Sequence, residues 1–159
     1  DTSRGLVALD NWLGNTNWDV IHFNWGLHDL CYRSDKSKMV GNRDKINGQQ
    51  SVPLTQYIQN LEKLVARLKK SGAKLIWATT TKVPNGEPGR FAGDEIKYNQ
   101  AAKKIMIKHG IVINDLHKLS SSIDASFFRK PGDVHYTPQG SCLLGKQVAD
   151  QIIRVLGQN

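Results

Sequence analysis

The sequence predicts a doubly wound α/β fold in a single domain of 159 residues. Three short apolar runs, at 19–24, 73–81 and 111–113, alternate with longer segments of helical periodicity. Strands separated by helices pair in parallel through right-handed crossovers, which gives a sheet with helices on its faces. No repeat, low-complexity tract or linker divides the sequence, and its length is sufficient to bury one core.

Apolar stripes and end signals predict four helices, at 3–13, 53–70, 94–109 and 138–156, and a helical turn within 117–128. Thr2 or Ser3 is expected to cap the first helix. Thr137 is expected to cap the last helix, with Pro138 in its first position. The inward face of this last helix is expected to carry Leu144, Val148, Ile152 and Leu156.

Two features point to surfaces used for binding. The segment 31–52 is long and polar, and such connections in a compact domain are usually functional or mobile, so we expect a substrate-facing rim. Three strands are few for a doubly wound sheet, and an unpaired strand at 19–24 would leave its backbone ladder open. We therefore expect strands upstream of Asp1, or a partner chain, to cover this edge. A second copy of this chain could also cover the edge, which would make the protein self-associate.

Composition excludes little. The net charge of +8 comes from basic residues spread over several helices and loops, so solubility is the favoured interpretation and anionic partners are the alternative. No specific nucleic-acid partner is expected. No run of about 18 apolar residues exists, so we expect no membrane span. Cys31 and Cys142 have no metal-ligand spacing and decide no compartment, and both are expected to be buried.

The first expected strand ends in a polar turn that could serve an active site. Gly26 lets the backbone approach a ligand closely, and Asn24 and His28 are donors that could stabilise an oxyanion. The structural alternatives are that Asn24 only caps the turn and that His28 only forms a hydrogen-bonded pair with Asp29. The tryptophans are expected mostly in the core, although Trp25 beside the turn could stack on a sugar.

A second candidate group lies just before the last helix. His135 carries an imidazole, the natural base for activating a hydroxyl, and Asp133 could orient it. The alternative is an exposed loop histidine beside an acid. Thr79–Thr81 form the end of the second expected strand, and Thr80 is expected to contact substrate. Asp115, after the third strand, is expected to cap a helix or bond a loop.

These groups resemble sequence blocks of the SGNH (GDSL-type) hydrolases. Gly26-Leu27-His28-Asp29 is similar to their third block, Gly-x-Asn-Asp, and Gly132-Asp133-Val134-His135 to their fifth, Asp-x-x-His. Trp77–Pro84 and Lys97–Asn99 resemble a carbohydrate-esterase-like branch. The resemblance implies a three-layer sandwich with a flavodoxin-like parallel sheet that lacks its first strands. It also implies Ser-His esterase activity on acyl esters of carbohydrates, acetyl esters included. No metal and no organic cofactor is implied.

Three departures from the family pattern matter. His28 replaces the asparagine of the third block, so an imidazole N–H or Asn24 would assist the Gly26 N–H in the oxyanion hole. Gly132 stands where the family has its acid, so either Asp133 or a backbone carbonyl would orient His135.

The first block, which carries the nucleophile, is absent, and Ser3 is better explained as a helix cap. The sequence as given is therefore expected to be inactive alone. The alternative function is a non-catalytic domain that binds anionic polysaccharide, nucleic acid or a partner chain.

Overall fold

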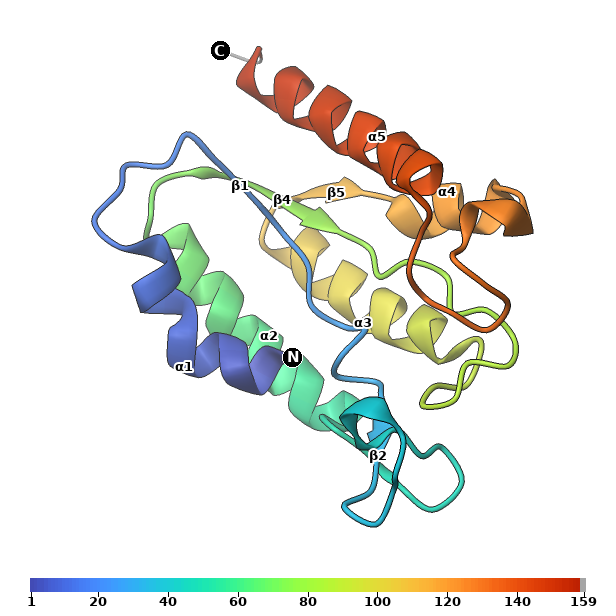
Figure 1. The fold of residues 1–159 in the computed structure, drawn as a ribbon. Coiled ribbons are helices and arrows are strands. Elements are labelled where there is room, and N and C mark those ends of the chain that lie inside the picture. Colours follow the sequence, from blue (N-terminus) through green and yellow to red (C-terminus); the bar gives the residue numbers. More distant parts are fainter. Residues whose placement is uncertain (158–159) are drawn as a thin grey trace.

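A three-stranded parallel sheet lies at the centre of the protein (Figure 1). Its order is β1 (Val20–Phe23), β4 (Lys74–Ala78) and β5 (Val112–Asn114), and β4 pairs with both neighbours. This computed structural model describes residues 1–157. Because the strands are parallel, their carboxyl ends meet at one edge of the sheet, where ligands bind in folds of this class.

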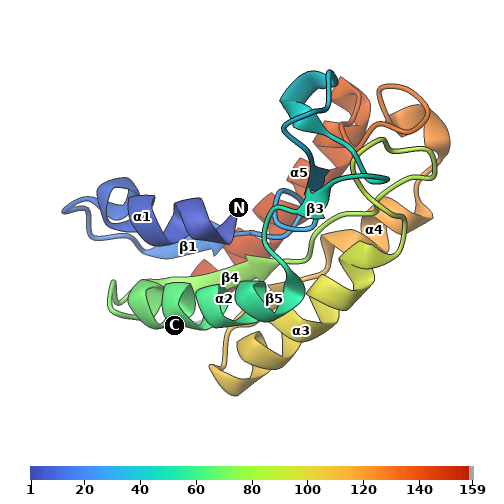
Figure 2. The same ribbon diagram turned by 90° about the horizontal axis from the view of Figure 1, so that it is seen from below.

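Helices cover both faces of the sheet, which confirms the predicted α/β three-layer class (Figures 1 and 2). On one side lie α2 (Leu54–Lys69) and α3 (Asp94–Lys108), and α1 (Thr2–Leu13) packs against α2. On the other side α5 (Pro138–Leu156) crosses the sheet, with α4 (Leu116–Ser122) beside it. No helix within residues 1–157 has both the length and the apolarity needed to cross a membrane.

The main core lies between the sheet and the helices α2 and α3. Alternate residues of β4 point to opposite faces, so Leu75 and Trp77 join this core while Ile76 is buried on the other face. The helices contribute the apolar stripes that the sequence pattern predicts. From α2 and α3 the buried members are Tyr57, Leu61, Leu64, Val65, Leu68, Tyr98, Ala102, Ile105 and Met106.

The cap of α1 differs from the prediction. Asp1 caps the helix through Oδ1, which accepts a hydrogen bond of 2.8 Å from the Arg4 N–H. Thr2 lies inside the helix and is buried, and its N–H and hydroxyl bond Asp29 at 2.7 and 2.5 Å. The expectation that Thr2 or Ser3 caps α1 is therefore wrong, because a carboxylate one residue earlier occupies that place.

The bounds of α5 are as predicted, but one of its expected inward residues is not. Thr137 caps it by accepting a hydrogen bond from the Gly140 N–H at 3.2 Å. At the other end Leu156 is 44% exposed and Val155 is buried in its place. Because an α-helix has 3.6 residues per turn, the strict four-residue spacing of the expected inward residues drifts around the helix, and Val155 takes the inward position in the last turn. Cys142 on this helix is exposed, which corrects the expectation that it is buried, whereas Cys31 is buried.

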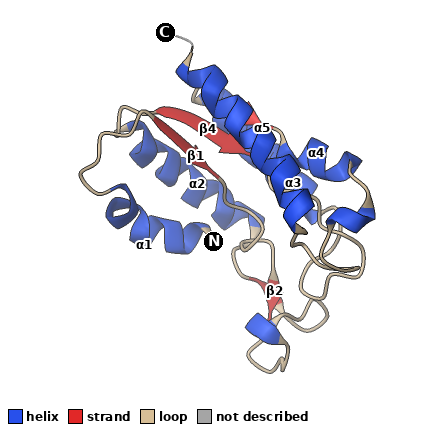
Figure 3. Ribbon diagram, turned by 45° about the horizontal axis from the view of Figure 1, so that its top comes forward, coloured by secondary structure: helices blue, strands red, loops and turns tan. Residues whose placement is uncertain are grey.

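The segment after the first polar turn contains more structure than expected. It holds a two-stranded antiparallel ribbon, β2 (Tyr32–Arg33) with β3 (Gln49–Gln50), and a 3₁₀ turn η1 (Val40–Asn42) between them. A second 3₁₀ turn, η2 (Ala125–Phe127), follows α4. The ribbon lies outside the main sheet, at the end where the carboxyl termini of β1 and β4 lie (Figure 3).

Strand β1 forms one edge of the sheet, and among the described residues no strand pairs with its outer side. A cavity of about 590 Å³ runs along it, bounded by β1, the polar turn and α1. Trp12 and Trp18 line this cavity and are exposed, so their predicted place in the core is wrong. Trp77 is buried as predicted. The remaining apolar walls of the cavity are Leu9, Leu13 and Leu68.

Candidate active site

The turn after β1 requires a glycine at position 26. The φ angle of Gly26 is +151°, and a Cβ there would lie 2.1 Å from the Thr80 Oγ1. Gly26 O accepts a hydrogen bond of 2.9 Å from the Leu30 N–H, which closes the turn. The close approach to Thr80 brings the backbone of the turn directly over the end of β4.

Successive backbone donors are left free by this turn. The N–H groups of Leu27, His28 and Asp29 have no acceptor among residues 1–157, as in the first turn of a helix. Free N–H groups in such a turn bind anions and oxyanions well. The turn therefore offers backbone donors as well as the side chains that the sequence indicated.

Asn24 and Thr80 hold the ends of β1 and β4 together. The Asn24 amide donates to Ala78 O at 2.7 Å and to the Thr80 Oγ1 at 3.4 Å. The Thr80 backbone is fixed by Asn99, whose side chain bonds both its N–H and its O at 2.8 Å. Thr80 is only 2% exposed and lies under the turn, so its predicted contact with substrate stays a prediction.

His28 is exposed and does not pair with its neighbour Asp29, which instead bonds Thr2. Partial burial, followed by the positive charges of the Asp1 amino group, Arg90 and Arg33, lowers the pKa of His28, and the Asp29 charge opposes the shift. The imidazole is therefore neutral at pH 7 and can donate one N–H.

Trp25 lies between the turn and α1. Its ring is within 3.0 Å of the place a Cβ on Gly5 would take, and its centroid is 5.6 Å from that of Phe23. Its carbonyl accepts a hydrogen bond from the Tyr57 hydroxyl at 2.9 Å. The half-buried ring also lines the cavity along β1, and its predicted contact with a sugar stays a prediction.

The second half of the candidate site is the pair formed by Asp133 and His135. Asp133 Oδ1 lies 2.6 Å from His135 Nδ1 and also accepts the His135 backbone N–H at 3.0 Å. The imidazole is 63% exposed, and its Nε2 has no partner in the described part of the chain. Burial raises the pKa of Asp133, but the hydrogen bonds and charge of His135 outweigh it and lower the pKa overall. An ionised Asp133 holds the proton on Nδ1, which leaves Nε2 as a base.

Gly132 explains why the acid stands two residues before the histidine. Its φ angle is +73°, and a Cβ would lie 2.8 Å from Gly86 O. A carboxylate at position 132 would therefore strain the backbone and collide with the loop after β4. Asp133, one residue later, places its carboxylate beside Nδ1 of His135 instead.

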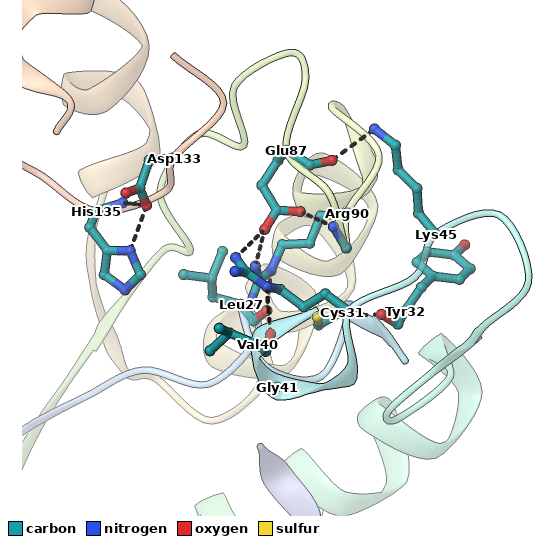
Figure 4. Close-up of polar contacts among 12 residues, drawn as sticks. Leu27, Cys31, Tyr32, Val40, Gly41, Lys45, Glu87, Arg90, Asp133 and His135 are labelled. Carbon is teal, nitrogen blue, oxygen red and sulfur yellow. Dashed lines mark hydrogen bonds and ion pairs between the residues drawn. The ribbon is translucent and has the colours of Figure 1, made fainter. Parts of the chain in front are cut away.

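One segment, residues 79–90, contacts both halves of the site. Gly86 packs against Gly132, and the Arg90 Nε donates to Leu27 O at 2.7 Å. Figure 4 draws the Asp133–His135 pair and Leu27 together with Glu87 and Arg90 of this segment. Both halves therefore lie at the carboxyl end of the parallel sheet.

A nucleophile is not seen beside the imidazole. Within residues 1–157 no hydroxyl or thiol is hydrogen-bonded to His135, and Ser3 lies on α1, where its Oγ accepts from Asn60 at 3.4 Å. The same residues contain no cluster of three His, Cys, Asp or Glu side chains that could hold a metal ion. The Asp133–His135 pair and the donors of the turn have the chemistry that a base, its orienting acid and an oxyanion hole require, and these roles stay predictions.

The sequence did not reveal Glu87 and Arg90, a buried pair next to the turn. Their closest side-chain atoms are 2.6 Å apart and both side chains are at most 5% exposed. A spacing of three residues is common in exposed ion pairs, so it carried no signal of burial. The only available sign was the concentration of proline and glycine around them, which indicates an ordered loop.

Comparison with known proteins places the fold. No family model matches the chain, and no curated protein matches it. A lipase/acylhydrolase from Enterococcus faecalis superposes with a TM-score of 0.70 at 20% identity, over 95% of this chain and 69% of that one. The acetyl xylan esterase AlAXEase gives 0.72 at 13% identity, over 96% and 76%.

An acetylxylan esterase from Geobacillus stearothermophilus, crystallised as a catalytic mutant, gives a TM-score of 0.69 at 14% identity, over 99% and 68% of the two chains. At these identities the likeness concerns the fold alone. The chain therefore shares the α/β fold of this lipase/acylhydrolase and of these acetyl xylan esterases, which is the fold that the resemblance implied.

Proposed function

We propose that this chain forms most of an SGNH-type serine esterase that removes acyl groups from carbohydrates. The observation that carries the proposal is the Asp133–His135 pair, with a free Nε2, at the same end of the sheet as a turn with free N–H groups. Two enzymes of the same fold are acetyl xylan esterases, and a second structure of the Geobacillus enzyme is described as that of an acetyl-xylooligosaccharide esterase. These support an acetylated oligosaccharide as substrate.

In the proposed reaction each group has one role. A serine hydroxyl attacks the ester carbonyl while His135 Nε2 takes its proton, and a bond forms between the serine oxygen and the carbonyl carbon. Asp133 stabilises the imidazolium. The oxyanion is bound by N–H groups of the Gly26 turn and by the neutral His28, with Asn24 in reserve because its amide already bonds Ala78. His135 returns the proton to the leaving alcohol, and water then hydrolyses the acyl-serine with the same base.

We further propose that the serine belongs to a segment outside the 159 residues, which pairs with the free edge of β1. Three observations support this: no hydroxyl bonds His135 among the described residues, β1 has an unpaired side, and the cavity along that side ends at the turn. A strand placed there would end next to Gly26. The 159 residues alone should then hydrolyse no ester appreciably.

The test compares the 159-residue chain with a protein that also includes the residues encoded before Asp1. We expect the longer protein to release acetate from acetylated xylo-oligosaccharides and the His135→Ala variant to lose this activity. The proposal that the serine lies outside the 159 residues would be contradicted if the short chain turned over p-nitrophenyl acetate and its His135→Ala variant did not. Full activity of the longer His135→Ala protein would contradict the role of His135 as the base, and absence of acetate release by the longer wild-type protein would contradict the esterase assignment itself.

A further inference from the structure

A buried carboxylate forms the hub of an ion cluster beside the polar turn. Glu87 is fully buried, and its Oε1 lies 2.6 Å from an Arg90 nitrogen and 3.5 Å from an Arg43 nitrogen. Its Oε2 accepts a hydrogen bond of 2.7 Å from the Gly89 N–H. Both oxygens of the carboxylate are thus used, and two arginines share its charge.

Each arginine of this cluster also holds a backbone carbonyl. The Arg90 Nε donates to Leu27 O at 2.7 Å, and the Arg43 Nε donates to Val40 O at 3.0 Å (Figure 4). Glu87 therefore connects the polar turn after β1 with the tip of the ribbon segment. Bonds from a charged donor are stronger and better directed than neutral ones, particularly where water is excluded.

The bond to Leu27 O fixes a peptide plane that carries a free donor. In a trans peptide the carbonyl of one residue and the N–H of the next point in opposite directions. Since Arg90 holds the Leu27 carbonyl towards the 84–90 loop, the His28 N–H points away from that loop. This N–H is one of the successive free donors in the turn.

We propose that Arg90, anchored by Glu87, is a positioning residue that orients the Leu27–His28 peptide so that the His28 N–H serves the oxyanion hole. The proposal rests on the function proposed above, but the orientation it describes can be measured without catalysis. Arg90 touches neither substrate nor reacting atoms. It acts through the peptide that it holds.

The alternative is that the pair only stabilises the loop, and two variants separate the possibilities. Arg90→Lys keeps the positive charge, but a lysine cannot bond Glu87 and Leu27 O with a planar fork. Glu87→Met combined with Arg90→Met removes the pair as a unit, a change that is often neutral for stability, so this variant is expected to fold. Arg67→Met is the matched control, because Arg67 also pairs with a carboxylate and bonds a carbonyl, Leu6 O, away from the turn.

The readout is hydrogen exchange and NMR of the folded chain. The Leu30 N–H bonds Gly26 O and reports closure of the turn. We expect its exchange to be roughly tenfold faster in both Arg90 variants and unchanged in Arg67→Met, with the amide of Ile76 in β4 as the internal reference. The pKa of His28 should rise in the double methionine variant, which loses the Arg90 charge, and stay constant in Arg90→Lys.

Unchanged Leu30 exchange in both Arg90 variants would overturn the proposal. A faster exchange that extends equally to Ile76 would overturn it too, since the pair would then only support the whole fold. In a protein that hydrolyses esters, Arg90→Lys should lower kcat about 100-fold and change KM little, as for loss of one oxyanion donor. If no ester is cleaved even by the longer protein, the proposed function fails while the exchange result still decides the role of Arg90 in the turn.

Discussion

The substitution Gly26→Ala tests the geometry of the turn after β1. Alanine at this position meets two costs. A φ angle of +151° is strained for any residue with a Cβ, which costs about 1–3 kcal/mol, and contact with Thr80 Oγ1 at 2.1 Å adds about 1–3 kcal/mol of overpacking. We therefore expect a loss of about 4 kcal/mol in the free energy of unfolding.

The assay is thermal unfolding followed by circular dichroism. For a chain of this size, 4 kcal/mol lowers Tm by roughly 8–16 °C. Gly72→Ala is the matched control, because Gly72 has a φ of +75° but no atom within 4 Å of an added Cβ. Gly72→Ala should lower the free energy of unfolding by only about 1 kcal/mol, from backbone strain alone.

A double variant separates the two costs. Combining Gly26→Ala with Thr80→Ala removes the Oγ1 atom that the alanine Cβ would contact. The double variant should therefore regain the part of the unfolding free energy lost to overpacking, about 2 kcal/mol, but not the part lost to backbone strain. The reasoning is refuted if Gly26→Ala costs no more than Gly72→Ala, or if removal of the threonine hydroxyl recovers nothing.

Three further predictions concern the acid, the pH and the open edge. In a protein with esterase activity, Asp133→Asn should lower kcat by about 10²- to 10⁴-fold, measured by acetate release, because Nδ1 loses its carboxylate; a change below threefold would exclude Asp133 as the orienting acid. Because the pKa of Asp133 is lowered in the folded state, its stabilising effect should be present above the unfolded pKa of about 3.9 and fade as pH falls through the lower folded value. Urea unfolding of wild type and Asp133→Asn should therefore differ at pH 6 and converge in acid, and a constant difference would contradict this sign. The short chain should self-associate through the free side of β1, and Trp12→Glu in the cavity wall should reduce this; a monomer by light scattering at every concentration would count against it.

The fold could be predicted from the sequence because its signals are local. The stripe of α2, the Thr137-Pro138 start of α5 and the apolar runs of three strands each depend on residues close in the chain. Asp115 illustrates the same point, since it caps α4 by accepting the Lys118 N–H and also bonds Thr79. Parallel pairing followed from the alternation of strands and helices.

What sequence reasoning missed depends on contacts between distant segments. The sequence alone suggests that Thr2 caps a helix, but in the structure Thr2 bonds Asp29. It also suggests that Asn24 is a free donor, but the Asn24 amide bonds Ala78 O. Likewise, the ribbon in 31–52 has two-residue strands that carry no periodic signal, and Glu87 is recognisable as buried only when Arg90 is folded against it.

Labelling with diisopropyl fluorophosphate tests the central claim most directly, since this reagent reacts much faster with a serine activated by a neighbouring base than with an ordinary hydroxyl. Mass spectrometry of the protein that includes the residues encoded before Asp1 should find the label on a serine upstream of Asp1, and His135→Ala should abolish it. A label on a serine within residues 1–159, or labelling that survives His135→Ala, would contradict a site built from His135 and an added strand beside β1.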